Sequence, residues 1–456
     1  MASIALGQMR RRPTAFVGLA VALFLAIATM TLFGSLLAAD VSAPTAVRKA
    51  SSGPGLALIA GAFGEIAVLV AFFTVVNALG FALRQQHREL ALLRTIAATP
   101  RQVRRLVRGQ IVATVLSVAV PGWVVGVAAA RRFLVALQER ELAAPGMRVP
   151  GTPVPLLVAL AAALVVGLSA SAVAARRISR IAPAAALAAS STEQGRTGVP
   201  RLLVGLGALA GGVLLLRLAA TRSAEQVDKA GQAALLGSVV LLIAVALAGP
   251  LAARVLATVL GAPVRALVPR AGWLAHANLR GYARRLSSAV VPVALLVGLS
   301  GTMLTMTSTS ERAAGAAATT VTSATDVWLR QAELTLLVCF AAVSTVNTLV
   351  AVTADRRREF ALLRLVGATR SQILRMLTVE SVLTTAVGVL LGTAVAGAAS
   401  AAFSTAVTGS AIPSVPVAAC AWIAAGAATL TVPVILTTGL RAVRGPATEV
   451  VGGGRD

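Results

Sequence analysis

Ten long apolar stretches constrain this chain of 456 residues more than any other feature, because each is long enough to cross a lipid bilayer as a helix. They cover approximately residues 15–38, 57–82, 111–130, 153–174, 201–220, 232–257, 287–308, 331–353, 380–402 and 415–437. With 57% apolar and 12% charged residues, the chain has too few polar groups to cover a water-soluble globule. We therefore expect an all-α polytopic membrane protein with about ten transmembrane helices.

The first apolar stretch, 15–38, follows three consecutive arginines, Arg10, Arg11 and Arg12, and this order also occurs in secretory signal peptides. The apolar region of a signal peptide is about 7–15 residues long, and this stretch has roughly 24. We therefore expect it to be retained as a membrane helix.

The basic residues predict the orientation of the helices, because lysine and arginine favour the cytoplasmic side of short loops. With both termini in the cytoplasm, the spans place 30 of the 41 basic residues inside and 11 outside, so we expect this topology. This asymmetry and contact with anionic lipid headgroups account for the formal charge of +25. Nucleic-acid binding is the competing explanation. Because the arginines are spread over many short loops without interleaved aromatic residues, we expect no nucleic-acid partner.

The loops on the outer side are too short to fold independently, because cores below roughly 40 residues usually need disulfides or metals. They cover residues 39–56, 131–152, 221–231, 309–330 and 403–414. The two cysteines, Cys339 and Cys420, lie inside apolar stretches, where a buried thiol is favoured over a disulfide or a metal ligand. We expect no metal site.

A segment of fifteen residues occurs twice in the chain, at 88–102 and 358–372, with nine identical positions. Each copy follows one apolar stretch and leads into the next, so one membrane unit is used twice. Apolar residues recur at helical spacing in both copies, which predicts that the preceding membrane helix continues into the cytoplasm as an amphipathic stalk.

The stalk is predicted to end at a corner. Thr99 with Gln102, and Thr369 with Gln372, have the spacing of a capping box, in which the threonine hydroxyl accepts from the glutamine amide and the glutamine side chain reaches back. Gly367 is suited to a helix C-terminus. We call each helix–corner–helix element, 88–102 and 358–372, a knuckle.

The charges of the two knuckles also match. Arg88, Glu89 and Arg94 of the first copy correspond to Arg358, Glu359 and Arg364 of the second. A solvated helix face that follows the positive-inside rule is one explanation for each arginine. Presentation of the same ionic pattern to a cytoplasmic partner is the other, and the repetition of the whole pattern favours it.

Together with Glu380, Gly388 and Gly392 in the following helix, the repeated segment resembles the FtsX-like permease domain of ABC transporters, a group that includes MacB-type, LolC/LolE-type and bacitracin-export-type permeases. The resemblance implies a first unit at 10–190, a connector and an intervening helix pair at 191–274, and a second unit at 275–450. It also implies a location in the bacterial plasma membrane.

In that family the knuckle docks into a separate ATPase subunit, which implies two ATPase subunits for a chain with two knuckles. The resemblance assigns the coupling role to Arg88, Glu89, Arg94, Thr99, Gln102, Arg358, Glu359, Arg364, Gly367, Thr369 and Gln372. Since the sequence has no G-x-x-x-x-G-K-[ST] segment, we expect the chain to be no enzyme itself and to hold no cofactor, with ATP and magnesium bound by the partner. The first copy has Ala97 and Gln110 in place of Gly367 and Glu380, so asymmetric coupling is expected.

Some residues inside the apolar stretches also match between the repeats. Asn77 and Asn347 serve either helix packing or a substrate pathway. Two pairs of glycines have the spacing that allows close helix approach, namely Gly122 with Gly126 and Gly388 with Gly392.

These features predict a permease subunit that couples ATP hydrolysis by separate subunits to export or extraction of an amphipathic or lipophilic substrate. A module that passes ATPase motion to a partner without moving a solute is the alternative. An ion-driven secondary transporter is a third possibility, but it would need membrane-embedded acidic residues at matched positions, and the sequence has none there.

Overall fold

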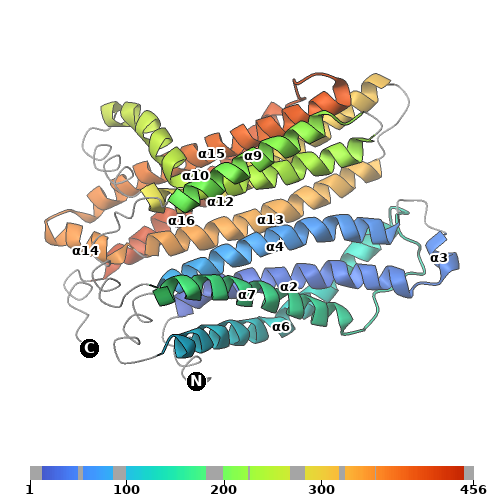
Figure 1. Cartoon of the computed structure of the whole chain (residues 1–456), viewed down its shortest axis with the longest axis horizontal. Coiled ribbons are helices and arrows are strands. Elements are labelled where there is room, and N and C mark those ends of the chain that lie inside the picture. Colours follow the sequence, from blue (N-terminus) through green and yellow to red (C-terminus); the bar gives the residue numbers. More distant parts are fainter. Residues whose placement is uncertain are drawn as a thin grey trace. The chain divides into compact units, whose positions relative to one another are not determined.

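The computed structural model describes residues 13–49, 55–85, 99–180, 199–223, 226–267, 283–317, 324–354 and 356–445. All regular elements in these ranges are helices, which confirms the predicted all-α class (Figure 1). Ten of the described helices have 22 residues or more, and each overlaps one of the ten predicted spans. Eight helices in the described ranges are long and apolar enough to cross a membrane. The other two, α4 and α7, contain shorter apolar stretches at Leu56–Glu65 and Val154–Ser169.

The chain folds as two compact units, Met1–Thr192 and Glu193–Asp456. The helix pair predicted between the repeats packs within the second of these units, against the first and third helices of the second repeat. The division into 10–190, 191–274 and 275–450 stays a prediction.

The first unit is built around its first long helix. Its helices are α2 (Pro13–Ser42), α3 (Thr45–Lys49), α4 (Leu56–Gln85), α6 (Pro100–Gln138) and α7 (Val154–Arg180). The helices α4, α6 and α7 all contact α2. Phe33, Phe63 and Phe133 form an aromatic cluster with ring centroids 5.9–6.5 Å apart, which joins three of these helices.

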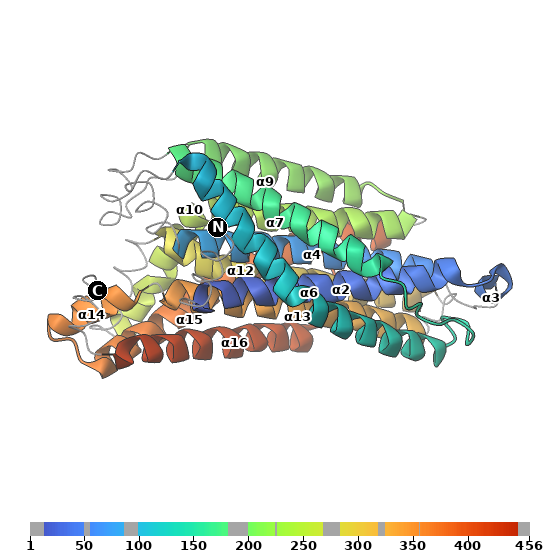
Figure 2. The same ribbon diagram turned by 90° about the horizontal axis from the view of Figure 1, so that it is seen from below.

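The second unit follows the same plan with two additional helices. Its helices are α9 (Val199–Ala220), α10 (Val227–Leu267), α12 (Ala283–Ala317), α13 (Ala324–Ala354), α14 (Arg357–Leu365), α15 (Arg370–Thr408) and α16 (Val417–Arg444). Here α12 is central, because α10, α13, α15 and α16 all contact it (Figure 2). In its apolar stretch, 89% of the residues are buried.

A proline inside α10 is compensated by an arginine of the neighbouring helix. Because Pro250 has no N–H, the carbonyl of Ala246 loses its usual intrahelical donor. The side chain of Arg201, at the start of α9, donates to this carbonyl at 2.9 Å and to that of Leu247 at 3.1 Å. Arg201 therefore joins α9 to α10 where the helix would otherwise expose a polar group.

The paired glycines lie where the third helix of each unit crosses the first. A Cβ atom on Gly122 or Gly126 of α6 would lie 3.0 Å from the Ile27 side chain or 2.5 Å from the Ala28 carbonyl oxygen of α2. In the second unit, a Cβ on Gly388 or Gly392 of α15 would meet α12 at 2.7–2.8 Å. Both crossings thus depend on glycine for backbone approach.

The prediction for the cysteine thiols was wrong for one of the two. Cys339, on α13, is exposed, and Cys420, on α16, is half-buried. Only part of α13 packs against α12 and α16, and Cys339 lies on its remaining surface. Both thiols are free.

Candidate functional site

The knuckle of the second unit consists of the short helix α14, a tight corner and the start of α15. The predicted stalk is the short helix α14, which begins at Arg357 shortly after α13 ends at Ala354. Arg356 lies between them with backbone angles of φ −86° and ψ 4°, outside the helix.

The corner after α14 is a Schellman motif. Gly367 has φ +99°, a left-handed conformation that favours glycine. Its N–H donates to the carbonyl of Arg364 at 3.0 Å, and the N–H of Ala368 donates to that of Leu363 at 2.9 Å. The predicted role of Gly367 in ending the helix is confirmed.

Both predicted capping boxes are present at the start of the third helices. In the second unit, the Thr369 hydroxyl accepts from the Gln372 N–H at 3.3 Å, and Gln372 Oε1 accepts from the Thr369 N–H at 2.9 Å. Thr99 and Gln102 form the same pair of bonds in the first unit, at 3.4 and 2.8 Å. These bonds satisfy amides that have no partner inside the helix.

One face of α14 is buried against the end of the helix bundle. Phe360 is fully buried there and contributes to an apolar cluster with residues of α12, α13, α15 and α16. The other buried members are Ala289, Leu349, Ile373, Met376, Leu377, Ile435, Ala442 and Val443. The knuckle is therefore held to four long helices by a single aromatic side chain and its neighbours.

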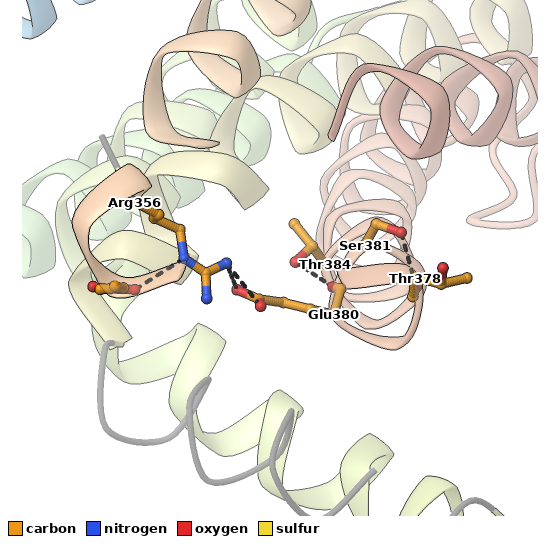
Figure 3. Close-up of polar contacts among 6 residues, drawn as sticks. Arg356, Thr378, Glu380, Ser381 and Thr384 are labelled. Carbon is orange, nitrogen blue, oxygen red and sulfur yellow. Dashed lines mark hydrogen bonds and ion pairs between the residues drawn. The ribbon is translucent and has the colours of Figure 1, made fainter. Parts of the chain in front are cut away.

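An ion pair fastens the start of α14 to α15 (Figure 3). Arg356 Nη1 lies 2.8 Å from both carboxylate oxygens of Glu380, and Arg356 Nε donates to Glu359 Oε2 at 3.2 Å. The guanidinium also lies 5.0 Å from the ring centroid of Phe360. The side chains of Arg356 and Glu380 are only 5% and 13% exposed, so water screens their attraction weakly.

A small cavity of about 20 Å³ adjoins this ion pair. Its polar lining comes from Thr353, Arg356, Glu380 and Thr384, and apolar residues of α12, α13 and α16 complete it. This volume suits about one water molecule. The Thr384 hydroxyl itself donates to the backbone carbonyl of Glu380 at 2.7 Å (Figure 3).

Arg364 joins the other end of α14 to the last helix of the unit. Its Nη1 donates to the carbonyls of Val443 and Gly445 at 2.9 and 2.5 Å, where the final carbonyls of α16 have no intrahelical donors. A cation there is also favoured by the helix dipole. Glu359 and Arg364 thus bind other residues of the same unit and fix the position of the knuckle. Their predicted role in ATPase coupling stays a prediction.

Replacing Arg364 with alanine is expected to loosen α14, because two carbonyls lose a charged donor with a net value of about 1.5–3 kcal/mol for such bonds. Trypsin should then cleave after Arg357 or Arg358 several times faster than in the wild type. Arg375→Ala, an exposed change on α15, serves as the control and should leave that cleavage rate unchanged. Equal rates for both variants would contradict the anchoring role.

The tip of the knuckle exposes apolar side chains. Val366 is 88% exposed, Leu365 51% and Leu362 46%. The same two helices carry exposed arginines, namely Arg357, Arg358, Arg370 and Arg375. An exposed apolar tip on an element that also carries basic side chains has the character of a protein docking surface.

The first unit is described for only part of its predicted site. Arg88, Glu89 and Arg94 lie outside the described residues. Gln110 of α6 is 3% exposed, and the Thr114 hydroxyl donates to its carbonyl at 2.8 Å, as Thr384 does to that of Glu380.

The matched asparagines both lie in the second helix of a unit. Asn77 is part of α4, and Asn347 is part of α13, where it is half-buried. Whether they serve packing or a pathway stays a prediction. The part of the chain that the structure describes contains no group of three or more His, Cys, Asp or Glu residues suited to a metal ion.

Sequence reasoning missed Arg356. The available signal was the comparison of the repeats, because the positions equivalent to Arg356 and Glu380 are Gln86 and Gln110 in the first copy. Both members of the charged pair are thus replaced together by neutral residues, which indicates that the two positions contact each other.

Comparison with protein families matches both halves of the chain. The family model described as FtsX-like permease C-terminal matches residues 61–183 and 333–445. Each match includes one knuckle and the helices on both sides of it. The comparison with curated proteins finds no match.

Proposed function

Because the chain belongs to the FtsX-like permease family, whose members generally pair with ABC ATPase subunits, we propose that it couples ATP hydrolysis by separate ATPase subunits to movement of an amphipathic or lipophilic substrate. The chain itself would bind no nucleotide. Each knuckle would receive one ATPase subunit on the cytoplasmic side of a bacterial plasma membrane, and both termini would lie on that side.

The main support for this proposal is the exposed tip of the knuckle, which consists of Leu362, Leu365 and Val366. Apolar side chains at a corner between two helices gain free energy when a partner covers them. The exposed arginines of α14 and α15 would then contact acidic groups of the partner. We therefore place the centre of the ATPase contact on these three residues.

Movement of the knuckle would reach the far side of the membrane through α15. This helix has 39 residues without a break, or about 58 Å at 1.5 Å per residue. Its capping box, its glycine crossing with α12 and the buried Phe360 resist independent movement of the knuckle. A rigid-body shift of α14 and α15 would therefore displace the helices that pack on them.

The proposed substrate class rests on the short outer loops and on the apolar helix surfaces. The connections on that side that the structure describes are short, such as 409–416 between α15 and α16. The helices α9 and α16 have only 22% and 17% of their apolar stretches buried. An amphipathic molecule could reach such surfaces laterally, from the lipid.

Replacing Val366 with aspartate tests the docking surface. The change places a charge in the centre of the proposed contact, so the amount of ATPase that co-purifies with the tagged chain from native membranes should fall at least tenfold. Mass spectrometry of the eluate identifies the ATPase and its stoichiometry. Two copies per chain are expected.

The matched control is Ile412→Asp, in the loop at the other end of α15. Ile412 is 81% exposed, close to the exposure of Val366, so its replacement introduces the same charge without touching the knuckle. Equal recovery of the ATPase with both variants would exclude Val366 from the contact. A wild-type chain that elutes without any ATPase would overturn the proposed function.

A further inference from the structure

The two knuckles differ in the residues that hold them. In the second unit, Arg356 bridges Glu359 of α14 and Glu380 of α15, with a side chain that is 5% exposed. The hydrogen bonds are charge-assisted and come from two different nitrogens of one planar group, so they restrict both the distance and the angle between the two helices. Phe360 packs below the same guanidinium.

The first unit replaces this arrangement with neutral residues. Gln86 and Gln110 stand at the positions of Arg356 and Glu380, while Glu89 is retained at the position of Glu359. Bonds between neutral amides are about half as strong as charge-assisted ones. Ala97 stands where the second unit uses the left-handed Gly367, a conformation that alanine disfavours. Neither Gln86 nor Gln110 carries the charge that forms the ion pair of the second unit.

The distance between knuckle and helix crossing is the same in both units. Gly122 meets Ile27 and Phe24 of α2, and Gly392 meets the equivalent residues Val297 and Ala294 of α12. The capping threonine precedes this glycine by 23 positions in each unit. The difference between the units therefore lies in the residues of the joint.

We propose that Arg356, Glu359 and Glu380 form a charge clamp that makes the second knuckle the stiffer of the two, so that ATPase motion reaches the membrane helices mainly through α14 and α15. The route of ATPase motion rests on the proposed function, whereas the stiffness of the second knuckle rests only on the contacts of Arg356. Arg356 and Glu380 act through the orientation of α14, as positioning residues. They lie below the exposed tip and leave it free for the partner.

The stiffness of the joint can be measured without any ATPase. Spin labels at Arg358→Cys on α14 and Gly397→Cys on α15, in a full-length chain with Cys339 and Cys420 replaced by alanine, report the position of α14 by pulsed electron resonance. Both sites are exposed, and no atom lies within 4 Å of a Cβ at Gly397. We expect one narrow distance distribution in this background. R356Q/E380Q, which copies the residues of the first unit, should at least double its width.

If R356Q/E380Q folds poorly, a second variant still tests the clamp by the same distance measurement. Arg356→Lys preserves the charge, but its single ammonium group cannot reproduce the two separately directed nitrogens. Its distribution should therefore have an intermediate width. Distributions of unchanged width in both variants would overturn the clamp.

The functional consequence is measured as stimulation of ATP hydrolysis in the purified complex. R356Q/E380Q should lower the stimulation at least fivefold at unchanged ATPase stoichiometry and melting temperature. Gln110→Met, which removes the amide in the first unit at nearly constant volume, should lower it less than twofold. Equal losses in the two variants would overturn the asymmetry. A wild-type complex without stimulation would overturn the proposed function, while the distance distributions still decide the clamp.

Discussion

Replacing Arg356 with alanine is expected to lower the free energy of unfolding by about 3–5 kcal/mol, the usual effect of removing one partner from a buried ion pair. The change would leave the Glu380 carboxylate, which is 13% exposed, without the cation 2.8 Å away. It would also remove the cation that lies over Phe360. For a unit of this size, the loss corresponds to a fall in the melting temperature of roughly 10 °C, measurable by scanning fluorimetry in detergent.

The control for this prediction is Arg357→Ala, one position along the chain. Arg357 is exposed, and surface changes of this kind usually alter the free energy of unfolding by less than about 0.5 kcal/mol. The double variant R356Q/E380Q should melt close to the wild type, because it leaves no unpaired charge. An Arg356→Ala protein that melts within 2 °C of the Arg357→Ala protein would contradict a buried ion pair.

Replacing Gly392 with leucine is expected to separate α15 from α12 and to abolish folding of the second unit. Even the first atom of the new side chain would lie 2.9 Å from the carbonyl oxygen of Ala294 and 2.8 Å from Val297 Cβ. Because backbone atoms block this space, rotamer changes cannot relieve the overlap. We expect a loss above about 3 kcal/mol, the upper end of the usual range for overpacking. Size-exclusion chromatography should show little monodisperse protein.

Gly397→Leu provides a matched control on the same helix. Gly397 is exposed, and no atom lies within 4 Å of a Cβ at this position. Leucine should be neutral or slightly stabilising there, because glycine is the weaker helix former by about 1 kcal/mol. Normal yield and melting temperature for both variants would show that the crossing of α12 and α15 does not depend on glycine.

The corners of the knuckles were predictable because they depend on residues close in the chain. The capping boxes of Thr99 and Thr369 are interactions over three positions, and the helix end at Gly367 depends on one residue that tolerates a left-handed backbone. The existence of ten long helices followed from the number of apolar residues that a bilayer requires. The corners thus depend on neighbouring residues, and the number of helices depends on the lengths of the apolar stretches.

The contacts of the charged residues were not predictable in the same way. Arg356 meets Glu380 over 24 positions, and Arg364 meets Val443 over 79. A pattern of charges on one helix face does not distinguish a cation that faces solvent from one that turns inward to a neighbouring helix. Only the repeat comparison, in which Gln86 and Gln110 replace both members of one pair, pointed to such a contact.

The choice of which helices lie inside the bundle depends on the packed fold. The apolar stretches of α12 and α16 have the same mean hydropathy, yet 89% of the first is buried and only 17% of the second. In water, apolar side chains would mark the buried face, but lipid is as apolar as a protein core, so both environments select the same residues. The amino-acid sequence alone therefore accounts for the number of helices and for the corners that join them. The central position of α12, the exposure of Cys339 on α13 and the ion pair at Arg356 arise only when the helices pack together.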